Sequence, residues 1–186
     1  MALLLLLLPP LGLGPGPASA QELNLQSVVR GNYDLAKVWG DWYSIAMAAS
    51  DVRRIREGGD LRVFIQKIEG AAGGSLRFFF HFMLLGDCVE VALVCEKTER
   101  SGECTLAHMG DNRVVLTETD YNLYAAFHLH SVRNRTQTRV MALYGRIPEL
   151  PHSFLHRFES LCRKHGLGPQ HILSLSTQDP CVLDRQ

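Results

Sequence analysis

Apolar and polar residues alternate along most of the chain between residues 42 and 146, in short runs separated by turn-forming residues. Such alternation predicts strands with one buried face, because successive side chains of a strand point to opposite sides. We predict eight strands, at residues 42–49, 61–68, 76–85, 88–97, 103–109, 113–119, 122–131 and 139–146.

The segments between these strands are short, and most have the composition of a tight turn. Gly86-Asp87 and Gly110-Asp111-Asn112 are examples, whereas residues 50–60 form one long, charged connection. Closely spaced strands joined by turns indicate a sandwich or a barrel rather than alternating strands and helices. A meander of eight strands closes naturally and leaves no exposed edge. The predicted fold is therefore all-β, an eight-stranded antiparallel up-and-down barrel.

One amphipathic helix follows the strands. Between Pro151 and His165 the apolar residues recur at helical spacing, which predicts a single buried stripe. Gly166 is placed to end this C-terminal α-helix, and Pro169 prevents it from resuming. A short strand is expected at residues 171–176. The stripe consists of Phe154, Leu155, Phe158, Leu161 and Cys162.

Basic and acidic residues number 19 each among the 186 residues, so the formal charge is zero. This balance gives no reason to expect a nucleic-acid partner. Residues 1–20 hold a leucine run too short to span a bilayer, followed by Ala18-Ser19-Ala20, and are typical of a cleaved signal peptide. We expect a secreted, extracellular protein without membrane insertion, whose single domain occupies residues 21–186.

Three short motifs stand at fixed places in this pattern. The first strand is preceded by residues 32–37, Asn-Tyr-Asp-Leu-Ala-Lys, and opens with Gly40-Asp41-Trp42. Gly40 suits a backbone bend, and Trp42 suits the closed end of a core. Thr119-Asp120-Tyr121 lies between two strands, and Leu143-Tyr144-Gly145-Arg146 ends the last one. In this order the motifs resemble the signature of the lipocalin family.

Within that family, residues 95–99 and 118–121 are similar to the rodent urinary, pheromone-carrying branch, and residues 21–22 and 58–64 to epididymal lipocalins. The resemblance implies a structural motif in which the Arg146 guanidinium packs over Trp42. It also implies a secreted carrier of an odorant, pheromone, retinoid or fatty acid, in epididymal fluid and sperm maturation. We expect a protein that is not an enzyme and that binds no cofactor and no metal. It is expected to be a monomer or weak dimer, and a cell-surface receptor is a possible partner.

Strand parity gives the side chains that are expected to face the barrel interior. Nearly all are apolar, which suits a small hydrophobic guest, and the resemblance directs the Tyr144 hydroxyl toward it. A barrel of eight strands holds either packed side chains or one small ligand. The alternative is therefore a filled barrel that acts on a protein partner through Ser50–Asp60. Leu76 shares the inward face, and the expected ligand-binding residues are Leu61, Val63, Ile65, Phe78, Phe80, Leu93, Leu106, His108, Val114, Leu116, Phe127, Leu129, Val140 and Tyr144.

Five cysteines in a secreted chain predict disulfides with at least one thiol left over. The resemblance pairs Cys88 with Cys181. Cys162 lies on the helix stripe and is expected to be a free core thiol. Cys95 and Cys104 point inward on neighbouring strands and either form a cross-strand disulfide or remain two buried thiols. In the second state a thiol could serve catalysis, as in the prostaglandin-isomerising lipocalins, although only His108 is an inward partner to activate it.

Two polar features remain outside this scheme. Asn134-Arg135-Thr136 is an N-glycosylation sequon on an exposed turn, and we expect a glycan on Asn134. His128 and His130 share the outward face of one strand without an obvious third ligand, so a solvated face is favoured over a metal site.

Overall fold

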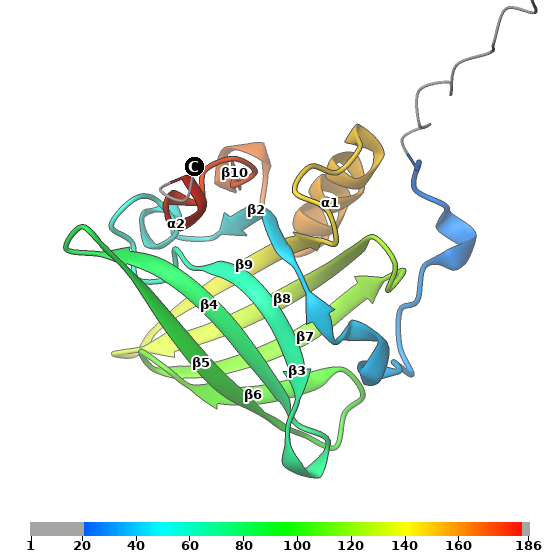
Figure 1. Ribbon diagram of the computed structural model, residues 1–186, viewed down its shortest axis with the longest axis horizontal. Helices are drawn as coiled ribbons and strands as arrows, with labels where there is room; N and C mark the ends of the chain where they lie inside the picture. The colour runs from blue at the N-terminus through cyan, green and yellow to red at the C-terminus, as the bar shows by residue number, and fades with distance from the viewer. Residues whose placement is uncertain (1–20, 184–186) are drawn as a thin grey trace, which may run out of the picture.

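The computed structural model describes residues 21–183, so the signal peptide expected at residues 1–20 lies outside the described part of the chain. One antiparallel sheet curls around a central core, with α1 (His152–Lys164) against its outer surface and α2 (Pro180–Leu183) near the end of the chain (Figure 1). The strands are β1 (Gly40–Asp41), β2 (Tyr43–Ala49), β3 (Phe64–Gly70), β4 (Leu76–Leu84), β5 (Asp87–Lys97), β6 (Glu103–Ala107), β7 (Asp111–Thr119), β8 (Tyr124–Arg133), β9 (Thr136–Gly145) and β10 (Ile172–Ser174).

A short strand, β1, precedes the predicted first strand, and Trp42 separates it from β2. β1 pairs with β3, whereas β2 pairs with β9 at the other end of the meander, which closes the sheet on itself. The predicted barrel is therefore confirmed. The structure has ten strands rather than eight because β1 was not predicted and because β10, the short strand expected near residue 171, pairs with β2.

Most predicted strands differ from the structure by one to three residues at one or both ends, and two of these differences concern inward-facing residues. Residues 61–63 belong to the connection after β2 rather than to β3, because the Leu61 amide donates to the Arg54 carbonyl within that connection. Asn112 was placed in a turn but belongs to β7. The turn is made instead by Met109 and Gly110, whose φ angles of 54° and 124° reverse the chain before Asp111.

Pairing along the meander is uneven. β4 pairs with β5 along its full length, from Leu76 opposite Cys95 to Leu84 opposite Asp87. β5 and β6, in contrast, pair only at Glu96–Thr105 and Lys97–Cys104. We call the junction of β5 with β6 the seam. A disulfide between Cys95 and Cys104 lies at the paired end of the seam.

Helix α1 covers the outer face of β2, β8 and β9. Phe154, Phe158, Leu161 and Cys162 are buried against Ile45, Tyr124, Met141 and Leu143, whereas Leu155 is only partly buried. The Leu167 amide donates to the Cys162 carbonyl over 2.9 Å and the Gly166 amide to that of Arg163 over 3.0 Å. This is a Schellman motif, and Gly166, at φ 74°, ends the helix as predicted. Neither helix in the described residues is long and apolar enough to cross a membrane.

The closed end of the barrel is organised around Trp42. Its side chain is 1% exposed, and its indole N–H donates to the Val38 carbonyl over 2.8 Å. The Arg146 guanidinium carbon lies 3.7 Å from the centre of the indole ring. Arg146 also donates to the carbonyls of Lys37, Trp39, Asp41 and Tyr121. A Cβ on Gly40 would lie 3.1 Å from the guanidinium, at a φ of 110° that favours glycine.

The neighbouring motif, residues 119–121, supports the same end. Asp120 accepts hydrogen bonds from the amides of Leu123 and Tyr124, and the Thr119 hydroxyl donates to the Tyr124 carbonyl. These bonds satisfy the backbone of the turn between β7 and β8. The motif residues thus act on the fold rather than on the barrel interior, as the resemblance implies.

A buried carboxylate joins the segment before β1 to the barrel and to α1. Glu118 is fully buried and receives hydrogen bonds from Arg157, Tyr124 and Arg30. Burial opposes its ionisation, but these donors outweigh burial and hold the pKa of Glu118 below its usual value. The ion pair between Arg157 of α1 and Glu118 of β7 therefore links the helix to the barrel wall.

Replacing Trp42 with Ala should cost about 3–5 kcal/mol of unfolding free energy, because a large buried side chain is removed and its stacking contact with Arg146 is lost with it. Chemical denaturation monitored by circular dichroism measures this change. Trp39→Ala is the matched control, since Trp39 is 49% exposed. Equal losses in the two variants would contradict the central role of Trp42.

His128 should make stability depend on pH between about 6.5 and 4. Burial first, then the charge of nearby His165, His130 and Arg113, lowers the pKa of His128 to about 4. The unfolded chain therefore takes up a proton that the folded chain refuses, so stability is present above 6.5 and is lost as pH falls toward 4. The melting temperature of His128→Phe should change less over this range. A variant at His156, which is exposed on α1, should keep the full slope.

Candidate ligand-binding site

An internal cavity lies within the barrel, bordered by β2, by β4 to β9 and by the connection after β2. The centre of a water-sized sphere can occupy about 90 Å³ of it, several times what one water molecule requires. The expected residues that border it are Leu61, Val63, Phe78, Phe80, Leu93, Leu106, His108, Val114, Phe127, Leu129, Val140 and Tyr144. The barrel is thus not completely filled by its own side chains.

Two expected residues, Ile65 and Leu116, do not border this cavity. Both are buried and belong to the same core. Leu116 lies nearer the closed end and borders a separate hollow with Tyr33, Leu76 and Cys104. Ile65 is level with the cavity residue Phe80 but does not reach the cavity. Strand parity gives the face on which a side chain lies, but neither its height along the barrel axis nor whether it reaches the open space.

Five bordering residues were not predicted: Met47, Asp60, Val91, Asn112 and Ala142. Val91 and Ala142 have the parity of Leu93 and Val140, so the sequence pattern already contained their signal. Asn112 has the parity of Val114, but its assignment to a turn concealed it. Asp60 comes from the long connection, for which no periodicity exists.

The long connection packs across the open end of the barrel. Arg54 makes a two-fold ion pair with Asp60, at 2.7 and 3.0 Å, and donates to the Thr138 hydroxyl. Arg133 donates to the same Asp60 carboxylate. The hydrogen bonds from Arg54, and secondarily from Arg133, hold the pKa of Asp60 below its usual value. Ile55, which belongs to this connection, is fully buried. The ion pairs and this buried side chain hold the connection over the open end of the barrel.

Tyr144 is one of the polar residues on the cavity wall. Burial raises the pKa of Tyr144 well above its usual value, so the phenol keeps its proton at neutral pH. Its ring lies 5.6 Å from that of Phe127, which in turn packs edge-on against Phe78. Because Phe127 also borders the hollow near the closed end, it separates the two spaces. The arrangement offers an apolar chamber with a neutral hydroxyl on one wall.

Four of the five cysteines form two disulfides. Cys88 is bonded to Cys181, as the resemblance implies, and Cys95 to Cys104. The alternative of two buried thiols at Cys95 and Cys104 is therefore wrong, and neither can supply a nucleophile to the cavity. Cys162 is the free cysteine of the described residues; burial raises its pKa to about 12, and it lies beneath α1, outside the barrel.

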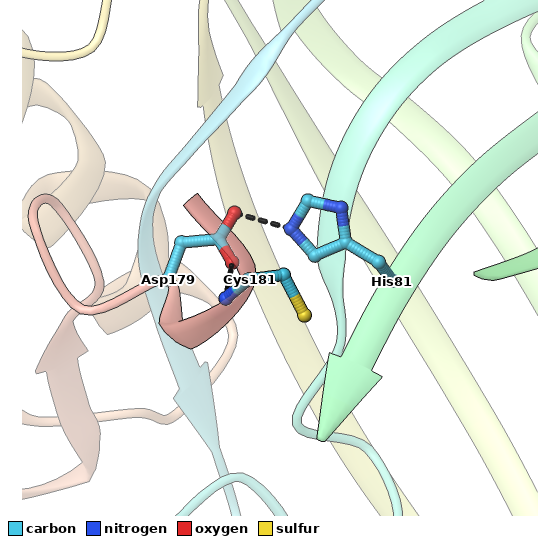
Figure 2. Close-up of side chains that lie close together, drawn as sticks. All are labelled: His81, Asp179 and Cys181. Atoms are coloured by element: carbon cyan, nitrogen blue, oxygen red, sulfur yellow. Dashed lines mark hydrogen bonds and ion pairs between the residues drawn. The ribbon is translucent and has the colours of Figure 1, made fainter. Parts of the chain in front are cut away.

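Two groups of side chains bear on metal binding. His81 and Asp179 form a pair beside Cys181 (Figure 2), but the Cys181 sulfur is already bonded to Cys88, so two donors remain. His128 faces outward as predicted but is only partly exposed, because His165 at the end of α1 stacks on it at 4.3 Å between ring centres. We assign neither group as a metal site.

The closed antiparallel barrel, the Trp42–Arg146 floor and the internal apolar chamber define a single class of β-barrel. Residues 39–179 match the model of the lipocalin / cytosolic fatty-acid binding protein family, and the chain belongs to this family.

Individual relatives agree with this assignment. The chain is 45% identical to mouse epididymal-specific lipocalin-9, over 96% of this chain and 100% of the relative. It is 34% identical to mouse major urinary protein 5, over 83% of this chain and 86% of the relative. Among solved structures, the possum milk whey lipocalin trichosurin with bound 4-ethylphenol superimposes with a TM-score of 0.72 and 32% identity, over 76% of this chain and 98% of that chain.

Peptide mapping without reduction should show both disulfides. Trypsin cleaves after Lys97 and Arg100, between Cys95 and Cys104, so the bridge should hold two separate peptides together until a reductant is added. Only Cys162 should react with an alkylating agent after denaturation. Alkylation of Cys95 and Cys104 without reduction would contradict the second bridge.

Proposed function

We propose that this protein is a secreted carrier that holds one small hydrophobic molecule in the barrel cavity. The observation that carries the proposal is the chamber itself, which lies inside the barrel, is largely apolar and is bordered by few polar groups. Burying a guest there would gain about 25 cal/mol for each Å² of apolar surface removed from water. The signal peptide of residues 1–20 and a glycan at Asn134 on the exposed β8–β9 turn belong to the same proposal.

The relatives support a volatile or odorant-sized guest. Trichosurin is described with bound 4-ethylphenol, and another solved neighbour is named an odorant-binding protein. The modest open space also favours such guests over retinoids and long fatty acids. The names of the epididymal and urinary relatives support release into a body fluid, and epididymal fluid and sperm maturation are the setting we propose.

A second role, contact with a receptor, is favoured by the hairpin tips beside the open end. Leu84 is 51% exposed and Leu85 97% exposed between β4 and β5, and Met109 is 49% exposed between β6 and β7. The alternative function, a filled barrel that contacts a protein partner through Ser50–Asp60, is less favourable than the carrier. The barrel contains a cavity, and Asp60 of this segment is ion-paired over the open end.

The carrier proposal predicts saturable, one-to-one uptake of a hydrophobic naphthylamine probe by the mature protein after extraction with organic solvent. Leu106→Trp should weaken uptake at least roughly tenfold, because the indole would occupy the chamber. Fluorescence titration and native mass spectrometry provide the measurements. Absence of saturable uptake by the folded, extracted wild type would contradict the proposal.

The matched control is Ala107→Trp. It lies on the same strand, one residue further, and is exposed on the outer face of β6. The same side chain is added there without entering the chamber, so uptake should be unchanged. Melting curves of both variants establish that they are folded.

A further inference from the structure

A second space, the hollow that Leu116 borders, lies on the closed-end side of the chamber, and we call it the floor hollow. The centre of a water-sized sphere can occupy about 280 Å³ of it, against about 90 Å³ of the chamber. Its inner wall is apolar and includes Leu35, Leu76 and Leu116. Its mouth lies at the β5–β6 turn, where Glu99 and Arg100 are exposed, so the floor hollow opens to solvent.

The chamber and the floor hollow meet at one level of the barrel. On three strands, two successive inward-facing residues lie on opposite sides of that level, since side chains two positions apart share a face. The pairs, with the chamber residue first, are Phe78 and Leu76 on β4, Leu106 and Cys104 on β6, and Val114 and Leu116 on β7. The two spaces are therefore consecutive parts of one barrel interior.

Phe127 stands at this level and is the one described residue that borders both spaces. It is 5% exposed and lies opposite Leu116 in the β7–β8 ladder. The centre of its ring is 5.7 Å from that of Phe78 and 5.6 Å from that of Tyr144, both of which belong to the chamber. Aromatic packing of this kind holds the ring in place. Phe127 therefore forms the boundary between the chamber and the floor hollow.

The floor hollow offers a surface for an apolar chain that is longer than the chamber. Its inner wall is aliphatic, and Cys104 is bonded to Cys95, so it presents no thiol there. Each methylene group of a guest that leaves water for such a surface should tighten binding by about fourfold. A chain growing out of the chamber would meet this surface only beyond Phe127, and the ring stands in its path.

We infer that Phe127 sets the upper length of the guest and that the floor hollow is a latent subsite for an alkyl tail. The ligands of the wild type are compact apolar molecules that fit the chamber. Long-chain alcohols and fatty acids are excluded by this one ring rather than by the barrel. The inference rests on the proposed carrier function and specifies which hydrophobic molecules the chamber accepts, so Phe127 is a specificity-determining residue.

The test compares octanol with dodecanol, which differ only in chain length. Dissociation constants come from displacement of the naphthylamine probe. In the wild type, dodecanol should bind no more than about twofold more tightly than octanol. In Phe127→Ala, where the chain can pass into the floor hollow, dodecanol should bind at least roughly tenfold more tightly than octanol. Phe127→Leu should show a smaller gain of the same sign, and melting curves establish that both variants are folded.

Leu35→Trp identifies the space that the tail enters. Leu35 is partly buried and borders the floor hollow but not the chamber, so an indole at this position would occupy the hollow. It should remove the gain of Phe127→Ala and leave the wild type unchanged. Phe80→Ala is the matched control, because it deletes the same ring from the chamber wall without opening the floor hollow. Adding Leu35→Trp to this control should not alter its ratio of the two affinities.

A wild type that binds dodecanol roughly tenfold more tightly than octanol would overturn the inference without any variant, because Phe127 would then not limit chain length. A folded Phe127→Ala without a gain would overturn it too. So would a gain that persists with Leu35→Trp, since the tail would then not lie in the floor hollow. Failure of the folded wild type to bind the probe and octanol would instead reject the carrier function itself.

Discussion

The stack of Arg146 on Trp42 is the interaction on which the rest of the structure depends. The guanidinium covers the indole face and, at the same time, donates hydrogen bonds to four backbone carbonyls. A planar cation with several donors can do both, which a lysine could not. This contact seals one end of the barrel, so that the space for a guest is displaced toward the other end.

The sequence contained most of the fold and a large part of the candidate site. Alternation predicted the strands, helical spacing predicted α1, and Gly166 marked its end. The remainder depends on three-dimensional information that periodicity lacks. Leu116 has inward parity but lies too near the floor, and Ile65 has inward parity without bordering the chamber. Asp60 reaches the chamber only because the connection folds over the open end. Whether Cys95 meets Cys104 is set by the register of β5 and β6 rather than by residue type.

The buried charges of this protein are used to position elements, and the chamber is kept almost free of charge. Glu118 gathers Arg30 and Arg157 outside the barrel, and Asp60 is neutralised by two arginines at the rim. A free charge facing the chamber would retain water and oppose an apolar guest. With the charges placed outside the chamber, affinity for a guest would come from buried apolar area, and selectivity would come from a few neutral groups.

The seam has a mechanical consequence. Between most other neighbours of the meander the strands pair along nearly their whole length, so a local displacement of one strand must be shared by the next. At the seam β5 and β6 are tied at one end by two residue pairs and the Cys95–Cys104 bridge, while the remaining length of β5 pairs with β4 alone and is anchored to the C-terminal tail by the Cys88–Cys181 bridge. The seam is therefore one of two lines along which few backbone hydrogen bonds hold the wall, the other lying between β1 and β3. Because the covalent bridge lies at the floor end of the seam, a separation of β5 from β6 would be confined to the length between the bridge and the rim.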